Sequence, residues 1–152
     1  MILIDTGPMV AMLNRNDKFH PWMLEQMAFA KPPLHTCESV ISESCFRLHQ
    51  AGLEVARVFE LMDRRIILVS FDLQAEHSAV GRLMSKYSNL PMDLADACLV
   101  RMAEKDSRAR VLTLDGDFII YRKHTRELVP TIMPGEIRTR ALRKTKQGRE
   151  EA

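Results

Sequence analysis

Short runs of apolar residues alternate along this chain with longer segments whose apolar residues recur at helical spacing. The apolar runs predict strands at residues 1–4, 34–36, 66–69, 111–114 and 128–129. The longer segments predict helices over residues 8–14, 38–51, 53–64, 72–87 and 92–105, and a further helix capped by Asp17 that ends before Lys31. Strands that are apolar throughout are buried on both faces. The alternation therefore predicts an α/β layered fold with a mostly parallel sheet.

Acidic residues follow two of the predicted strands directly. Asp5 comes after the first strand, and Asp115 and Asp117 come after the strand at 111–114. Ligands of parallel α/β sheets bind beyond the carboxyl ends of the strands. If these two strands are neighbours, the acids should stand at the same edge of the sheet. Taken singly, each of them has an ordinary explanation as a turn residue.

Three more acids lie on predicted helices. Glu43 lies within the helix at 38–51, and Asp93 and Asp96 lie near the start of the helix at 92–105. Asp93 and Asp96 are three residues apart and therefore share a helix face. Glu43 alone would be a solvated side chain, and Asp93 alone would complement the helix dipole. Asp96 differs because residues 94–100 are otherwise apolar, so its carboxylate needs a partner to be buried.

Clustered carboxylates repel one another and raise one another's pKa, so such a cluster persists mainly when a cation neutralises it. Carboxylate oxygens select Mg²⁺ or Mn²⁺. The five histidines and three cysteines are scattered, without metal-ligand spacing. The residues therefore indicate phosphoryl chemistry assisted by a hard divalent cation.

Four short motifs occur in an order that resembles the PIN-domain ribonucleases, including the toxins of type II toxin–antitoxin pairs. They are Ile4-Asp5-Thr6, Ser42-Glu43, Asp96-Ala97-Cys98-Leu99 and Leu112-Thr113-Leu114-Asp115-Gly116-Asp117-Phe118. Each motif is weak alone, and the four in this order are more specific. The resemblance covers residues 2 to about 129 and implies a single three-layer α/β/α sandwich with a short, mostly parallel central sheet.

The resemblance also implies an active site, substrate and partners. The implied catalytic residues are Asp5, Glu43, Asp96 and Asp115, the implied Mg²⁺ or Mn²⁺ ligands are Asp5, Asp96, Asp115, Asp117 and Asp93, and the supporting residues are Thr6 and Thr113. Either Asp93 or Asp96 could be the principal ligand of its helix, and the motif favours Asp96. Arg47 is a weak candidate for substrate binding, as is Lys18 for phosphate contacts. The substrate would be RNA, the partner an antitoxin, and the oligomer a homodimer.

Composition and charge predict a cellular compartment and a domain boundary. The chain has 152 residues, enough for one domain. It has no apolar run long enough for a membrane helix and no basic lead before Asp5, and its three cysteines read as reduced thiols of a cytoplasmic protein. Residues 1–137 carry 16 basic and 18 acidic side chains, a net charge of −2. Six basic residues follow in 138–152. We expect a PIN-like nuclease domain at 1–137 and a flexible basic tail at 138–152, with a phosphate-binding arm as the alternative for the tail.

Two other functions compete with the nuclease. A metal-dependent phosphatase of the haloacid dehalogenase type also begins with a strand that ends in Asp. It needs a second Asp two residues later, where this chain has Gly7. A PIN-like module that binds RNA or protein without cutting is the other alternative. Metal dependence of cleavage distinguishes the enzyme from the binding module.

Overall fold

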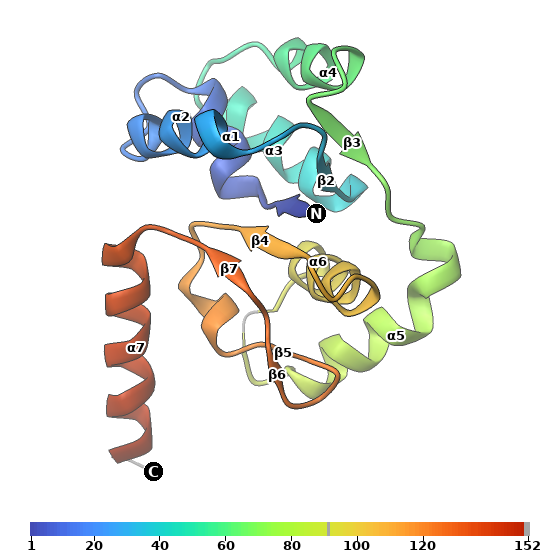
Figure 1. The fold of residues 1–152 in the computed structure, drawn as a ribbon, viewed down its shortest axis with the longest axis vertical. Helices are drawn as coiled ribbons and strands as arrows, with labels where there is room; N and C mark the ends of the chain where they lie inside the picture. The colour runs from blue at the N-terminus through green and yellow to red at the C-terminus, as the bar shows by residue number, and fades with distance from the viewer. Residues whose placement is uncertain (91, 151–152) are drawn as a thin grey trace.

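Five short parallel strands form the central sheet in the computed structural model, which describes residues 1–90 and 92–150. The strands are β1 (Ile2–Ile4), β2 (Leu34–Thr36), β3 (Ile67–Val69), β4 (Arg110–Leu112) and β7 (Thr131–Ile132), in the order β3-β2-β1-β4-β7 (Figure 1). Strand β1 is central, and Leu3 pairs with His35 on one side and Val111 on the other. Leu3 is fully buried, as expected for a strand covered on both faces. The predicted α/β fold with a parallel sheet is confirmed.

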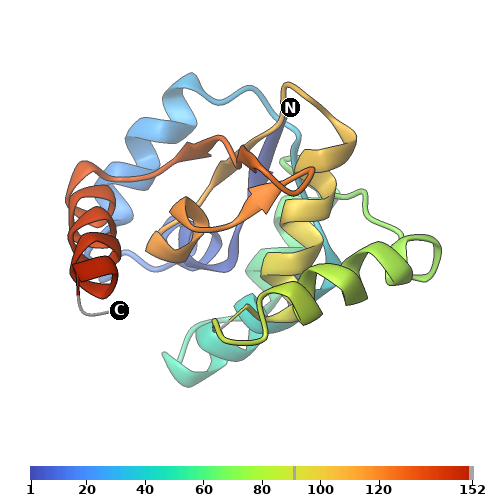
Figure 2. The same cartoon turned by 90° about the horizontal axis from the view of Figure 1, so that it is seen from below.

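Helices flank this sheet and supply the rest of the core. They are α1 (Thr6–Leu13), α2 (His20–Phe29), α3 (Glu38–Gln50), α4 (Ala56–Asp63), α5 (Leu73–Lys86), α6 (Leu94–Lys105) and α7 (Gly135–Glu150). Helices α5 and α6 pack against each other, while α7 lies at the opposite side of the molecule in both views (Figures 1 and 2). Within the described residues, no helix is both long and apolar enough to cross a membrane.

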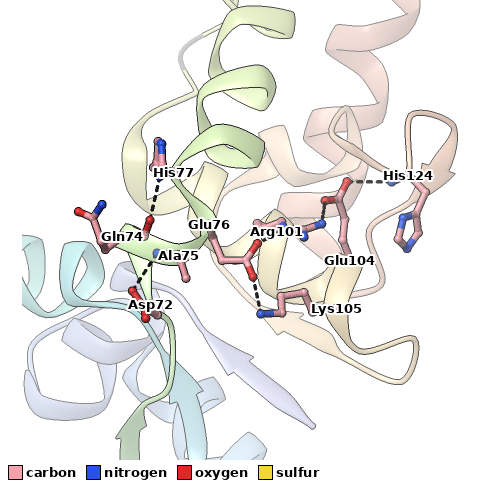
Figure 3. Close-up of polar contacts among 9 residues, drawn as sticks. All are labelled: Asp72, Gln74, Ala75, Glu76, His77, Arg101, Glu104, Lys105 and His124. Carbon is pink, nitrogen blue, oxygen red and sulfur yellow. Dashed lines mark hydrogen bonds and ion pairs between the residues drawn. The ribbon is translucent and has the colours of Figure 1, made fainter.

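A polar network ties α5 to α6 at one side of the fold (Figure 3). Glu76 on α5 accepts from Arg101 Nε at 2.7 Å and from Lys105 Nζ at 2.5 Å. Arg101 also donates to Glu104 at 2.9 Å, and Glu104 accepts from the backbone N–H of His124 at 2.9 Å. Because α6 carries two of the predicted site residues at its other end, this network helps to fix the orientation of that helix.

Two predicted elements are wrong in detail. Helix α2 begins at His20 rather than after Asp17, because Asp17 Oδ1 accepts from the N–H of Phe19 at 2.8 Å in a turn before the helix. The strand predicted at 128–129 is not in the central sheet. Instead β6 (Glu127–Leu128) pairs antiparallel with β5 (Arg122–Lys123) in a separate hairpin. The fifth strand is β7, which the sequence analysis missed because Pro130 and Pro134 leave it only two residues long.

The segment predicted to be a flexible tail is helical. Residues 138–150 belong to α7, which begins at Gly135, so the boundary placed after residue 137 falls inside a helix. The helix packs on the single-turn 3₁₀ helix η1 (Gly116–Ile119). Gly116 permits this contact, because a Cβ on Gly116 would lie 2.7 Å from the Cβ of Ala141. The flexibility of the segment stays a prediction.

Candidate functional site

A cleft of about 480 Å³ opens at the carboxyl edge of the sheet, and six carboxylate side chains line it. They are Asp5, Asp17, Glu43, Asp93, Asp96 and Asp115. Asp5 follows β1 and Asp115 lies three residues after β4. The parallel pairing of Ile4 with Leu112 brings these two strand ends to the same edge. Helix α3 adds Glu43, the start of α6 adds Asp93 and Asp96, and the loop before α2 adds Asp17.

Asp5 is held rigidly at the floor of the cleft. Its Oδ1 accepts from the N–H of Thr6 at 2.7 Å, which caps α1, and its Oδ2 accepts from Thr113 Oγ1 at 2.7 Å. Asp5 is only 7% exposed. Burial is the main cause that raises the pKa of Asp5 to about 6. The two hydrogen bonds lower this pKa, and the charges of Asp115 and Glu43 raise it.

Asp96 is the most strongly perturbed acid of the cleft. Its Oδ2 accepts from the N–H of Asp93 at 3.3 Å and from the hydroxyl of Tyr121 at 3.1 Å, while its own N–H donates to Asp93 Oδ1 at 2.9 Å. Asp93 and Asp96 thus form a capping box at the start of α6. Asp96 is 5% exposed, and burial, followed by the charges of Asp93 and Asp5, raises its pKa to about 8. Asp93 is exposed.

The two threonines of the predicted motifs organise their neighbours. Thr113 Oγ1 accepts from the N–H of Asp115 at 2.9 Å and donates to Asp5, so one hydroxyl links two acids of the cleft. Thr6 Oγ1 donates to Glu43 Oε2 at 3.2 Å. Asp115 is half-buried, and its pKa is raised mainly by burial and then by the charges of nearby acids.

The remaining predicted residues lie at the margin of the cleft or beyond it. Arg47 lines the cleft from α3 and is exposed, and Lys18 lines it from the loop before α2. Asp117 does not line this cleft. It lies in a neighbouring cavity beside α7, where its N–H donates to Asp115 Oδ1 at 2.8 Å.

The donor set of the cleft fits a hard divalent cation, because it consists of carboxylates whose pKa values are raised by burial and mutual repulsion. The positions of these side chains, in contrast, do not form a complete metal site. Among the described residues, no three acidic, histidine or cysteine side chains are grouped closely enough to hold one ion. Binding would therefore require the carboxylates to move together, and the charge of an ion would remove the repulsion that opposes this.

Sequence reasoning missed one residue that contacts the site and two that line it. Tyr121 is fully buried, donates to Asp96, and packs edge-on against Tyr87 and Phe118. Its neighbours in sequence carry no motif, and its partner is 25 residues away, so only the fold reveals it. Asp17 and Phe19 line the cleft because the loop before α2 folds over it.

The five-stranded parallel sheet flanked by helices is consistent with a PIN-like α/β fold. A solved structure with the same fold is VapC20 of Mycobacterium tuberculosis, a toxin that cleaves the sarcin–ricin loop. The two superpose with a TM-score of 0.66 over 77% of this chain and 92% of VapC20, at 18% sequence identity. No protein-family model matches this chain, and no curated protein matches it in sequence.

Proposed function

We propose that this protein is a ribonuclease that hydrolyses RNA phosphodiester bonds in the carboxylate cleft, with Mg²⁺ or Mn²⁺ as the cofactor. The observation that carries the proposal is the set of six carboxylates in one cleft, two of which, Asp5 and Asp96, are buried without any neutralising cation side chain among their hydrogen-bond partners. Buried like charges destabilise a fold, so their retention is best explained by a cationic ligand. The likeness of the fold to VapC20 supports RNA as the substrate.

We assign the residues of the cleft separate roles in holding and orienting the cation ligands. Asp5, Asp96 and Asp115 would hold the cation, and Thr113 and Tyr121 would orient two of them through their hydroxyls. A bound Mg²⁺ or Mn²⁺ would supply a Lewis acid that lowers the pKa of a water and stabilises charge on the phosphate. Burial and the Asp96 carboxylate raise the pKa of Tyr121, which keeps its hydroxyl protonated as a donor.

Glu43 would act on the attacking water. Its Oε2 accepts from Thr6, and its Oε1 accepts no hydrogen bond from the described residues. As the water attacks phosphorus, Glu43 Oε1 would accept a proton from it, while the P–O bond to the leaving ribose oxygen breaks and that oxygen takes a proton from solvent. Asp93 would add negative charge at the mouth of the cleft and keep α6 in place through its cap. Asp117 would act only through its contact with Asp115.

RNA cleavage by the purified protein tests this proposal. Labelled total RNA is incubated with Mg²⁺, with Mn²⁺ and with EDTA, using wild type, Asp96→Asn and Asp93→Asn. Asp63→Asn is the matched control, because Asp63 is exposed at the end of α4 and outside the cleft. We expect discrete fragments that require the cation, are lost in Asp96→Asn and persist in Asp63→Asn. Loss only in Asp93→Asn would make Asp93 the principal ligand. Binding without cleavage in every lane would favour a non-catalytic module.

The toxin role and its partners belong to the same proposal. Its support is the fold shared with the VapC20 toxin. We propose an antitoxin that covers the acidic cleft, a homodimer, and a cytoplasmic location that suits the three free thiols. Co-purification with the product of an adjacent short gene, and the mass of the purified protein in solution, test the first two. A small-ester phosphatase activity without RNA cleavage would favour the phosphatase alternative.

A further inference from the structure

A second cavity of about 410 Å³ adjoins the carboxylate cleft on the side of α7. The cleft and this cavity share Leu114 and Asp115, so a bound polymer that leaves the cleft past Asp115 enters the cavity directly. One wall is the segment from Leu114 to Asp117. The other wall is α7, which contributes Arg140 and Lys144.

The face of α7 that borders this cavity is basic and exposed. Arg140, Arg143 and Lys144 lie at helical spacings of three and four residues, and all three are exposed. None of them lies within 4.0 Å of a carboxylate in the part of the chain that the structure describes. Arg140 and Lys144 therefore face the acid-lined wall of the cavity with their charges available to a ligand.

Packing fixes this basic face relative to the cleft. Ile137 and Ala141, which line the same cavity as Arg140 and Lys144, lie against Gly116. Glu136 pairs with Lys18 of the cleft rim at 3.3 Å, and Arg138 Nη2 donates to Thr131 Oγ1 on β7 at 2.9 Å. These contacts place the helix beside the cleft by tertiary structure rather than by charge attraction alone.

The charge distribution explains why such a helix is needed. Residues 1–137 have a net charge of −2, and the cleft concentrates six carboxylates, so the body of the protein repels a polyanion. Nucleic-acid binding proteins obtain most of their affinity from lysine and arginine contacts to phosphates. The largest concentration of basic residues in the chain is on α7.

We propose that Arg140 and Lys144 bind consecutive backbone phosphates of an RNA strand on the side of Asp115, and so position the strand in the carboxylate cleft. This inference rests on the proposed ribonuclease function, since it assigns the RNA path to that cleft. Arg143, one turn further around the helix, extends the same surface outward.

RNA binding in the absence of cleavage tests the inference separately from the function. The probe is a fluorescein-labelled single-stranded RNA of about 16 nucleotides, and the readout is anisotropy in EDTA at several salt concentrations. All proteins carry Asp96→Asn as a cleavage-deficient background. The test variant adds Arg140→Gln and Lys144→Gln. The matched control adds Arg64→Gln and Arg82→Gln, which remove the same charge from two exposed arginines, one directly after α4 and one on α5.

Loss of two single-strand phosphate contacts reduces the slope of log K against log salt by about 1.4 and weakens binding about 25-fold at 0.1 M salt. We expect this change in the test variant. In the control, the change in log K should be less than about a third as large. Equal weakening of the two variants would show a general charge effect and overturn the inference. Unchanged affinity of the test variant would also overturn the inference and would indicate that α7 binds an acidic protein partner instead.

Cleavage by the otherwise wild-type chain completes the test. With Arg140→Gln and Lys144→Gln alone, we expect KM to rise by a similar factor while kcat at saturating RNA stays within about twofold, because the carboxylates are untouched. An unchanged KM would contradict the inference. Absence of cleavage even in wild type, together with binding that depends on Arg140 and Lys144, would overturn the proposed function and leave the RNA-binding surface standing.

Discussion

Replacing Asp96 by asparagine should stabilise the metal-free protein, although it removes a residue that the proposed activity requires. The carboxylate is buried and repelled by Asp93, Asp5 and Asp115, which together with burial raise its pKa from 3.8 to about 8. The side-chain oxygen of asparagine can accept from the N–H of Asp93 and the hydroxyl of Tyr121 as Asp96 Oδ2 does. The substitution therefore removes the charge and keeps the hydrogen bonds.

The pKa shift sets the direction and size of the effect. Because the folded state binds the proton more tightly than the unfolded state, the contribution of Asp96 to stability is complete below pH 3.8 and is lost as the pH rises through about 8. Each unit of pKa corresponds to 1.36 kcal/mol, so the loss approaches about 6 kcal/mol above pH 8. Since a domain is stable by only about 5 to 15 kcal/mol, wild type without cation should be close to unfolding at pH 9.

Urea unfolding followed by circular dichroism, in EDTA at about pH 5, 7 and 9, measures this difference. We expect wild type to lose several kcal/mol across this range, Asp96→Asn to lose much less, and Asp63→Asn to follow wild type. Excess Mg²⁺ should restore wild type at high pH and have little effect on Asp96→Asn. Parallel pH dependences of wild type and Asp96→Asn, or a less stable Asp96→Asn protein at pH 9, would refute the account of a desolvated and repelled carboxylate.

Three further substitutions test other contacts of the site. Thr113→Val removes the hydroxyl that donates to Asp5, and should cost about 2 kcal/mol in urea unfolding near pH 8, whereas Thr113→Ser should cost less than half of that. Gly116→Ala places a Cβ 2.7 Å from the Cβ of Ala141, so amide hydrogen exchange in α7 should accelerate. Adding Ala141→Gly to the same protein should reverse this acceleration. Unchanged exchange would contradict the packing of α7 on Gly116. Asp93→Ala removes the cap of α6 and should cost about 1 kcal/mol of thermal stability, while Asp93→Asn should cost little; equal losses would show that the cap is not the cause.

The sequence alone was sufficient to predict most of the secondary structure and the class of fold. Apolar strands such as residues 66–69 and amphipathic helices such as 92–105 follow from local periodicity, which depends only on neighbouring residues. The motif order also placed Asp5, Asp96 and Asp115 at element ends, where the parallel topology then brought them together. Asp5 and Asp115 share an edge because a parallel sheet converts strand order into a shared edge, whereas the roles of these acids as metal ligands stay predictions.

Tertiary structure decided what depends on distant partners. Tyr121 reaches Asp96 because β5, which follows it directly, packs against α6, and no local pattern encodes that contact. Strand β7 is too short to be recognised and exists because β4 offers an unpaired edge. The basic segment after residue 137 shows only high charge in the sequence. It lies beside the cleft as helix α7 because Gly116 leaves room for Ala141. Local periodicity thus determines elements, whereas contacts between residues far apart in the chain determine which charges meet.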